Sequence, residues 1–278
     1  MAQPARLASH DFRSECRRWR QHRKLSQLEL ALAANVSQRH VSWLETGKSQ
    51  PSREMVVRLS EAMEIPLRER NQLLQSAGFS ALYSEKGLDE PGMEPVLNAV
   101  RHVLAHHDPY PAVAVDRFWN VKMQNDSAGL LFGLAGDPAS LMQQLGEEGD
   151  FNLALLTLHP DGLRRHIANW NQIAPDFIRR LRSEALASGD ADMQERFERF
   201  IELAGPVSES DMAHTSLLPV LPLELELDGQ RFSMFSIITT IGTPQDITTD
   251  ELRVEAFYPA DTATERFFDA IATRDQPA

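Results

Sequence analysis

The sequence predicts an all-α domain of five short helices followed by an α+β domain with a small antiparallel sheet. Its 278 residues are enough for two ordinary domains, and 42% apolar with 24% charged residues is typical of folded globular chains. Apolar residues recur at helical spacing up to about residue 79, whereas alternating, strand-like segments join the helices beyond residue 95. The charge balance also changes sign between these two parts, which supports a boundary there.

The charge asymmetry indicates different partners for the two parts. Residues 1–80 hold 13 Lys and Arg against 8 Asp and Glu, a net charge of +5, in a chain whose total is −12. The remaining residues hold 15 against 32, a net charge of −17. Because nucleic acid is bound through Lys and Arg, only the first part is a candidate for that partner.

Cysteine content and hydropathy narrow the class of protein further. The single cysteine, Cys16, excludes an intramolecular disulfide framework and a Cys-rich metal site. The sequence has no stretch of about 18 apolar residues, and its N-terminus lacks the apolar core of a secretory signal. We therefore expect a soluble, cytoplasmic protein that does not enter a membrane.

We expect residues 1–9 to be a flexible tail, 10–79 to be the helical domain, 80–94 to be a linker and 95–278 to be the α+β domain. The linker is rich in Gly, Pro and charged residues. Local signals delimit the helices: side chains that cap a helix N-terminus, residues suited to the left-handed conformation, and a proline before the fifth helix. These residues are Ser26 with Glu29 as a capping box, Ser37, Ser52, Asn35, Gly47 and Pro66.

The clearest strand signal is a hairpin over residues 223–234. Alternating residues meet at Asp228-Gly229, a favoured two-residue turn. The resulting register pairs apolar residues on one face and places Glu226 opposite Arg231 on the other, which predicts a solvent-side contact. We also expect helices over 95–107, over 161–203 with a break near 188–190, and over 261–274, and a short helix that is capped by Asn125-Asp126. Further strands are expected on both sides of a turn at 118–120, at 235–241 and at 252–258.

Helices two and three, joined by residues 34–36, have the length and spacing of a helix-turn-helix. In that motif the first residues of the second helix reach base edges in the major groove, and here they are Ser37, Gln38, Arg39 and His40. Glutamine pairs well with adenine, and arginine with guanine. Gln27, at the start of helix two, is placed to bind a phosphate through its side chain and the helix N-terminal amides. The alternative is an ordinary helical bundle with a solvated basic face.

The segment SQLELALAANVSQRHVSWLETGKSQPS lies at the centre of residues 13–67, which resemble the phage-repressor-like (XRE-type) helix-turn-helix family. The resemblance implies a transcriptional regulator in which Arg20 and Glu45 form a largely buried ion pair. It assigns base contacts to Gln38, Arg39 and Trp43 and phosphate contacts to Gln27 and Lys48. Trp43 departs from the family, in which a smaller polar residue is common there. Contact with a thymine methyl, with the sugar backbone or with a neighbouring subunit all stay open for it.

The later part of the chain resembles the MmyB-type ligand-binding domain, a PAS-like module. PAVAVDRFWNVKMQND, HPDGLRRHIANWNQIAPDFIRRLRSEA and LPLELELDGQRFSMFS carry this resemblance, which spans roughly residues 95–272. It implies a sensor with an apolar pocket between sheet and helices for a fatty-acyl or similar small effector. The candidate lining residues are Phe118, Trp119, Phe132, Trp170, Phe177, Met234 and Phe235. The alternative is that these side chains only fill the core.

Signals for catalysis are weak. His102 and His106 have the i, i+4 spacing of a metal site, but no third ligand is evident. No Gly-x-Ser-x-Gly elbow or phosphate-binding glycine loop is present. Cys16 lies on the inner face of helix one, which favours a buried thiol over a redox sensor. We therefore predict no enzyme, no catalytic residues, no metal and no cofactor.

Together these observations predict a bacterial transcriptional regulator. Helix 38–46 would enter the major groove of double-stranded operator DNA, and a homodimer would bind an inverted repeat, because one helix-turn-helix buries too little DNA surface for strong specificity. The second domain would bind a small apolar effector. Two alternatives stay open for that domain, namely a protein-interaction module without a ligand, and an enzyme autoregulated by its own helix-turn-helix.

Overall fold

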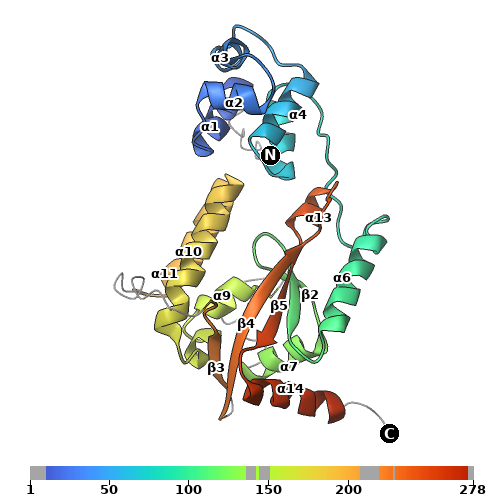
Figure 1. Cartoon of the computed structure of the whole chain (residues 1–278), viewed down its shortest axis with the longest axis vertical. Helices are drawn as coiled ribbons and strands as arrows, with labels where there is room; N and C mark the ends of the chain where they lie inside the picture. Colours follow the sequence, from blue (N-terminus) through green and yellow to red (C-terminus); the bar gives the residue numbers. More distant parts are fainter. Residues whose placement is uncertain (1–10, 136–141, 144–150, 207–218, 228, 275–278) are drawn as a thin grey trace, which may run out of the picture. The chain divides into compact units, whose positions relative to one another are not determined.

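The computed structural model of the chain describes residues 11–135, 142–143, 151–206, 219–227 and 229–274 (Figure 1). The chain folds into two compact units. The first contains the residues up to Lys86 together with 187–189 and 244–250, and the second contains 87–186, 190–243 and the residues from Glu251 onwards.

Five helices form the described part of the first 80 residues: α1 (Phe12–His22), α2 (Gln27–Ala33), α3 (Gln38–Thr46), α4 (Arg53–Ala62) and α5 (Leu67–Ser76). The predicted capping box is confirmed, because Ser26 and Glu29 each accept the other's backbone N–H with their side chains. Ser37 and Ser52 cap α3 and α4 as predicted. Gly47 ends α3 with a φ of +73°, which a residue without a Cβ adopts at no steric cost.

The apolar core of the first unit lies between these helices. Cys16 and Trp19 of α1, Leu30 of α2 and Leu44 of α3 are all buried in it. Burial raises the pKa of the Cys16 thiol to about 12, and the charge of Glu45 adds to this effect. The thiol therefore stays protonated at neutral pH, as expected of a structural cysteine.

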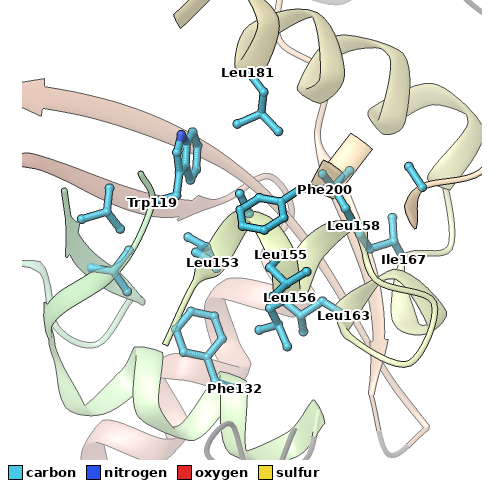
Figure 2. Packing of buried hydrophobic residues seen from close by; sticks show 14 of the residues in the cluster. Trp119, Phe132, Leu153, Leu155, Leu156, Leu158, Leu163, Ile167, Leu181 and Phe200 are labelled. Carbon is cyan, nitrogen blue, oxygen red and sulfur yellow. The ribbon is translucent and has the colours of Figure 1, made fainter. Parts of the chain in front are cut away.

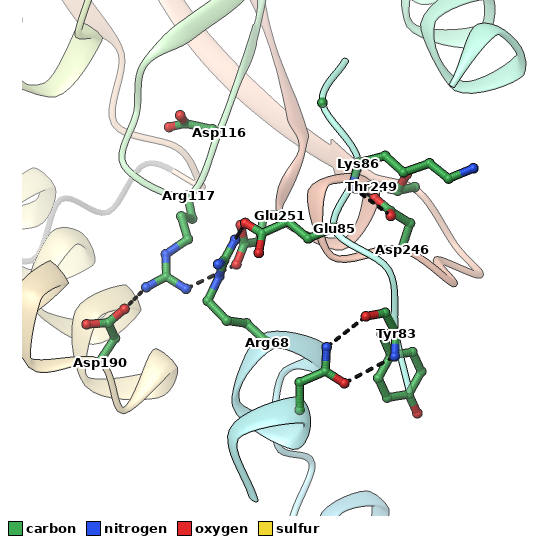
Figure 3. Close-up of polar contacts among 12 residues, drawn as sticks. Arg68, Tyr83, Glu85, Lys86, Asp116, Arg117, Asp190, Asp246, Thr249 and Glu251 are labelled. Atoms are coloured by element: carbon green, nitrogen blue, oxygen red, sulfur yellow. Dashed lines mark hydrogen bonds and ion pairs between the residues drawn. The ribbon is translucent and has the colours of Figure 1, made fainter. Parts of the chain in front are cut away.

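Side-chain hydrogen bonds order the segment that follows α5 within the first unit (Figure 3). Asn71 donates to the Tyr83 carbonyl at 2.7 Å and accepts from the backbone N–H groups of Leu82 and Tyr83 at 2.8 and 3.1 Å. The Ser84 hydroxyl donates to Asp246 at 2.7 Å, just before α13 (Ile247–Glu251). Residues 82–84 thus follow a defined path although they belong to no helix.

The second unit is built on a five-stranded antiparallel sheet with the order β2-β1-β5-β4-β3. Its strands are β1 (Ala112–Val115), β2 (Val121–Gln124), β3 (Leu223–Leu227), β4 (Gln230–Thr240) and β5 (Arg253–Pro259). The predicted strand at 235–241 is the second half of β4, which runs on unbroken from the hairpin. With the helical first unit, this sheet confirms the predicted order of an all-α domain and an α+β domain.

The two faces of the sheet carry separate cores. On one face, Val100 and Leu104 of α6 (Glu94–His107) pack against Ala112, Ala114 and Val254. Helices cover the other face, and Figure 2 shows this larger core around Trp119, Phe132, Leu155 and Phe200. Its helices are α7 (Asp126–Ala135), α9 (Leu153–Leu158), η1 (Leu163–His166), α10 (Trp170–Ser188), α11 (Ala191–Leu203) and α14 (Thr262–Arg274).

The helical prediction for residues 161–203 was wrong at its beginning. Helix α10 begins at Trp170, and only the short 3-10 turn η1 precedes it. The reason is tertiary, because Ala168 donates its backbone N–H to Glu224 of β3 at 2.8 Å and so holds the chain extended. The predicted break is confirmed, since α10 ends at Ser188 and Asp190 caps α11.

The predicted hairpin register is confirmed, but one predicted contact is wrong. Glu226 lies opposite Arg231 in the ladder, yet Arg231 forms its ion pair with Glu224. The right-handed twist of a two-stranded ribbon brings such diagonal neighbours within reach of a long side chain. Of the predicted turn residues, Asp228 lies outside the described residues and Gly229 has a φ of +74°.

Candidate functional site

Helix α3 buries one face and exposes another. Val41 and Leu44 are fully buried, whereas Gln38, Arg39 and Trp43 are exposed on the opposite side. Ser37 caps the helix by accepting the backbone N–H of His40 at 3.2 Å. The half-buried His40 and the exposed Lys48 lie at the two ends of this helix. The first turns of α3 therefore present polar groups with hydrogen-bonding capacity on a rigid support.

Arg39 and Trp43 are one helical turn apart and touch each other. The Arg39 guanidinium carbon lies 4.4 Å from the centroid of the Trp43 ring, a cation–π distance. The ring is itself 36% exposed. Trp43 thus restricts the orientations that Arg39 can adopt at the surface.

A buried ion pair joins α1 to α3. Arg20 binds the Glu45 carboxylate through two nitrogens, at 2.6 and 3.0 Å, and the Gln27 amide donates to the same carboxylate at 2.9 Å. Burial alone would raise the pKa of Glu45, but hydrogen bonds from Arg20 and Gln27 and the charges of Arg20 and Arg17 hold it below its ordinary value. The ionised carboxylate therefore connects three helices.

The hydrogen bond from Gln27 to Glu45 affects the phosphate contact that the sequence predicts for Gln27 at the start of α2. The side-chain amide nitrogen donates one hydrogen bond to Glu45, and it carries two hydrogens. The second hydrogen stays available to an acceptor, and Glu45 limits the directions in which it can point. The Gln27 side chain is thereby held in a defined orientation by Glu45.

A cavity of about 250 Å³ lies inside the second unit, between the sheet and helices α7, α9 and α10. Its wall is mostly apolar. Trp119, Phe132, Phe177, Met234 and Phe235 are among the lining residues. Of the seven aromatic and methionine residues that the sequence suggests, only Phe118 and Trp170 do not line it.

Those two residues pack elsewhere in the second unit. Phe118 lies against the core with the guanidiniums of Arg117 and Arg196 at 4.8 and 5.4 Å from its ring centroid. Trp170 faces Arg164 at 4.9 Å. Arg117 also pairs with Asp190 and Glu251 (Figure 3), so the turn that carries Phe118 is tied to the N-cap of α11 and to the last residue of α13.

The cavity has a charged corner where α10 meets β5. Arg180 and Glu255 line the cavity there. Glu184, behind them, accepts from Arg180, Arg253 and the Trp119 indole at 2.9, 2.8 and 2.9 Å. Trp119 adopts a φ of +68°, an uncommon conformation for a residue with a side chain, and its ring is buried. Only a well-packed environment keeps a tryptophan in that conformation.

The pKa values of the two carboxyl groups in this corner shift in opposite directions. Burial acts to raise the pKa of Glu184, but Arg253, Arg180 and the Trp119 hydrogen bond hold it below its ordinary value. Burial also raises the pKa of Glu255, and there Arg180, Ser236 and Arg253 do not offset it. The partners of Glu184 therefore favour its ionised form, whereas burial disfavours ionisation of Glu255.

Comparison with known families decides what these two sites belong to. The family model described as MmyB-like transcription regulator ligand binding domain matches residues 96–271, well over half of the chain. The chain belongs to this MmyB-like family. A helix-turn-helix family model matches residues 17–70, which contain α3 and the ion pair of Arg20 with Glu45. This MmyB-like protein is thus a transcription regulator that joins a helix-turn-helix to a ligand-binding domain.

Other comparisons add little to this assignment. No curated protein matches the MmyB-like regulator significantly. A solved structure described as "Structure of an RNA-binding Light-Oxygen-Voltage Receptor" is 12% identical, with a TM-score of 0.24, over 99% of this chain and 69% of its own.

Sequence reasoning missed the charged corner of the MmyB-like regulator. Arg180 belongs to a run of charged helix residues, and Glu255 is one charge in a short strand, so neither differs from a surface residue in the sequence. The one available signal is strand alternation, because Arg253, Glu255 and Phe257 share a sheet face. That signal becomes informative only when the helices that cover this face are known.

The histidine pair of α6 makes local contacts in the MmyB-like regulator. The Nδ1 atoms of His102 and His106 lie 2.7 Å from the carbonyl oxygens of Asn98 and His102. In the part of the chain that the structure describes, no three His, Cys, Asp or Glu side chains gather to hold a metal ion. No helix among the described residues is long and apolar enough to cross a membrane.

Proposed function

We propose that this regulator binds operator DNA as a homodimer and places α3 in the major groove. The observation that carries this proposal is the exposed edge of α3, where Gln38 and Arg39 stand free of the core while the opposite face is buried. Gln38 reads adenine and Arg39 reads guanine, each through paired hydrogen bonds. Ser37 and His40 lie beside them at the start of the helix and complete the contact surface.

Phosphate contacts would fix the register of α3 on the duplex. The exposed Lys48 follows α3, and Gln27 lies at the start of α2 with an amide hydrogen still available. Contacts of this kind carry no sequence information, but they position the residues that do. The ion pair of Arg20 with Glu45 keeps α1 and α3 in a constant relative orientation while the phosphate contacts form.

Binding to the DNA that flanks its own gene tests the base-reading assignment. Each good side-chain pair with a base is worth about 1–3 kcal/mol, so the double variant Gln38→Ala, Arg39→Ala should bind specific DNA at least about thirtyfold more weakly. Fluorescence anisotropy at fixed salt with excess nonspecific DNA measures this. The matched control is Arg58→Ala on α4, because that arginine forms an exposed pair with Glu54. Unchanged specific binding by the double variant would contradict the assignment.

We infer that the cavity in the second unit binds a small, largely apolar effector, of which a fatty-acyl group is one candidate. Support comes from its mostly apolar wall and from its volume of about 250 Å³, close to the lower limit of ordinary ligand pockets. Effector binding would change the affinity of the dimer for its operator.

Native mass spectrometry of the full-length protein separates this proposal from the interaction-module alternative. A bound effector predicts an added mass that is lost on denaturation, whereas an interaction module without a ligand predicts the bare chain mass. The same spectrum reports the oligomeric state. Monomers at concentrations at which specific DNA is bound would contradict the homodimer.

A further inference from the structure

Strand β4 is longer than its neighbour β3, and its second half has a free edge. β3 pairs only with residues 230–234 of β4, whereas β5 pairs with residues 234–240 on the other side. Figure 1 shows β4 running on past the end of β3. Among the described residues, no strand and no isolated bridge pairs with residues 235–240 on the β3 side. Half of the backbone hydrogen-bonding groups in this stretch therefore point away from the sheet.

The hairpin register identifies these backbone groups. Gln230 closes the two-residue turn, so Gln230 and every second residue up to Met234 direct their N–H and C=O groups toward β3. The ladder of β4 with β5 continues to Thr240 without a shift in register. Because the direction alternates along a strand, Ser236, Ile238 and Thr240 direct their N–H and C=O groups toward the free edge.

The other edges of the sheet are protected against pairing. At the opposite side of the sheet, β2 has only four residues, and one of them is Lys122. Along β3, Ala168 donates its backbone N–H to Glu224 at 2.8 Å, and Ile167 forms a bridge with Leu225. Short length, charged residues and a covering segment are the usual means by which an edge avoids another chain. In the part of the chain that the structure describes, the second half of β4 has none of these protections.

The free edge has the composition of a strand that pairs with another. Residues 232–245 contain no charged side chain, although 24% of the whole chain is charged. Ile237 is 46% exposed, and Thr239 and Thr240 are exposed too. Residues 81–278 hold 15 Lys and Arg against 32 Asp and Glu, a net charge of −17, so two copies of this domain repel each other in general. An uncharged edge is therefore a suitable place for two copies to meet.

We propose that residues 235–240 of β4 pair with the same residues of a second copy of the chain, in antiparallel orientation about a two-fold axis at Ile238. This proposal rests on the homodimer of the proposed function, and it names the surface that forms that dimer. Ser236 pairs with Thr240 of the partner subunit, and Ile238 pairs with its own counterpart. The two residues of each such pair exchange both N–H···O bonds, so the outward groups of the edge are satisfied.

The side chains fit the same arrangement. A two-fold axis perpendicular to the sheet makes each face of one sheet continuous with the same face of the other. Ile237 shares a face with its ladder partner Ala256, which belongs to the core beneath α6. On that face Ile237 lies opposite Thr239 of the partner subunit, and on the other face the two copies of Ile238 are neighbours. Both contacts join uncharged, β-branched side chains, which stabilise cross-strand pairs.

Charge substitutions at Ile237 and Thr239 test this register, because the axis places each of them opposite the other. Three full-length double variants are compared with the wild type by sedimentation equilibrium: Ile237→Lys with Thr239→Lys, Ile237→Glu with Thr239→Glu, and Ile237→Lys with Thr239→Glu. The first two place like charges opposite each other, and the third places opposite charges there. We expect the dimer dissociation constants of the like-charged variants to exceed that of the mixed variant at least about fivefold.

The mixed variant is the matched control, because it carries the same number of new charges at the same two positions. The two like-charged variants change the net charge of the chain in opposite directions. A weaker dimer in both of them is therefore not an effect of net charge.

Disulfide capture tests the same register with a second readout. Directly opposite residues whose backbones do not bond each other have Cα atoms about 4.5 Å apart, within the reach of a disulfide. When chains with Ile237→Cys and chains with Thr239→Cys are mixed in the reduced state and oxidised by air, they should form linked dimers. Either variant alone should not, because identical positions are then diagonal neighbours about 7–8 Å apart. The native Cys16 is buried and does not compete.

The outcomes separate the surface from the homodimer itself. If the wild type is monomeric at concentrations at which it binds specific DNA, the homodimer and this surface are both contradicted. If the wild type and all three charge variants dimerise equally well, the free edge of β4 is not the dimer surface although the homodimer stands. If the three charge variants weaken the dimer equally and the cysteine mixture is not linked, the pairing about Ile238 is wrong.

Discussion

The two units of the molecule each bury a glutamate beside an arginine, with opposite results. Glu45 in the helix-turn-helix is 4% exposed and Glu255 in the ligand-binding domain is 6% exposed. Glu45 receives two hydrogen bonds from Arg20 and one from Gln27, and its pKa falls. Glu255 receives a hydrogen bond from Ser236 but lies 3.7 Å from Arg180, too far for a hydrogen bond to that arginine, and its pKa rises. The two side chains expose similar fractions of their surface, but Glu255 lies deeper in the protein, so the depth of burial and the partners together decide the direction of each pKa shift.

An arginine packed on a tryptophan also occurs in both units. The distance from guanidinium to ring centroid is 4.4 Å for Arg39 on Trp43 and 4.6 Å for Arg180 on Trp119. Trp43 is exposed, whereas the Trp119 ring is 1% exposed. The same contact thus orients a surface arginine in one unit and an arginine that lines the cavity in the other.

The largest expected effect comes from Glu45→Gln. This change leaves Arg20 nearly buried without a charged partner, and breaking such a pair costs about 3–5 kcal/mol of unfolding free energy. Urea denaturation followed by circular dichroism measures the loss. The control is Glu54→Gln, because its exposed pair with Arg58 is worth only about 0.5 kcal/mol. A similarly small loss for Glu45→Gln would show that the two buried glutamates do not differ as described.

A smaller effect of the opposite sign is expected for Glu255→Gln. As the pH rises above the ordinary carboxyl value of 4.5, the wild type loses stability until Glu255 ionises in the folded state, and the variant does not. The variant should therefore become more stable relative to the wild type on the alkaline side, with the difference growing as the pH rises above 4.5. For Glu45, whose pKa is lowered, the stabilisation is present above 4.5 and is lost as the pH falls below that value.

Stability measured as a function of pH checks both signs in one experiment. The difference between Glu45→Gln and the wild type should shrink toward acid, and the difference between Glu255→Gln and the wild type should grow toward alkali. If both differences change in the same direction, the contrast between the two glutamates fails.

The smallest expected effect is that of Trp43→Ala on DNA binding. Loss of an exposed cation–π contact is worth about 0.5–1 kcal/mol, so specific affinity should fall about two- to fivefold, with little change in unfolding free energy. Trp43→Phe should retain part of the affinity, because phenylalanine still offers a ring to Arg39. In the Arg39→Ala background, Trp43→Ala should cost nothing further. An additional loss there would mean that Trp43 contacts the DNA itself.

Local signals in the sequence were sufficient for much of the fold. The serine caps of α2, α3 and α4, the turn at Gly47 and the ladder of β3 with β4 were all predictable, because each depends on residues within a few positions of one another. The start of α10 was not predictable, because it depends on backbone pairing between Ala168 and Glu224, which are far apart in the chain.

The two candidate sites also differ in whether local sequence signals predict them. The exposed edge of α3 depends on helical periodicity, so Gln38, Arg39 and Trp43 could be named from the sequence alone. The charged corner of the cavity depends on where α10 crosses β5, and no local pattern relates Arg180 to Glu255. Sequence by itself therefore determined the helix-turn-helix and the exposed edge of its second helix. Only the tertiary structure decided which carboxylates are buried and which of them an arginine satisfies, since desolvation depends on everything packed around a group.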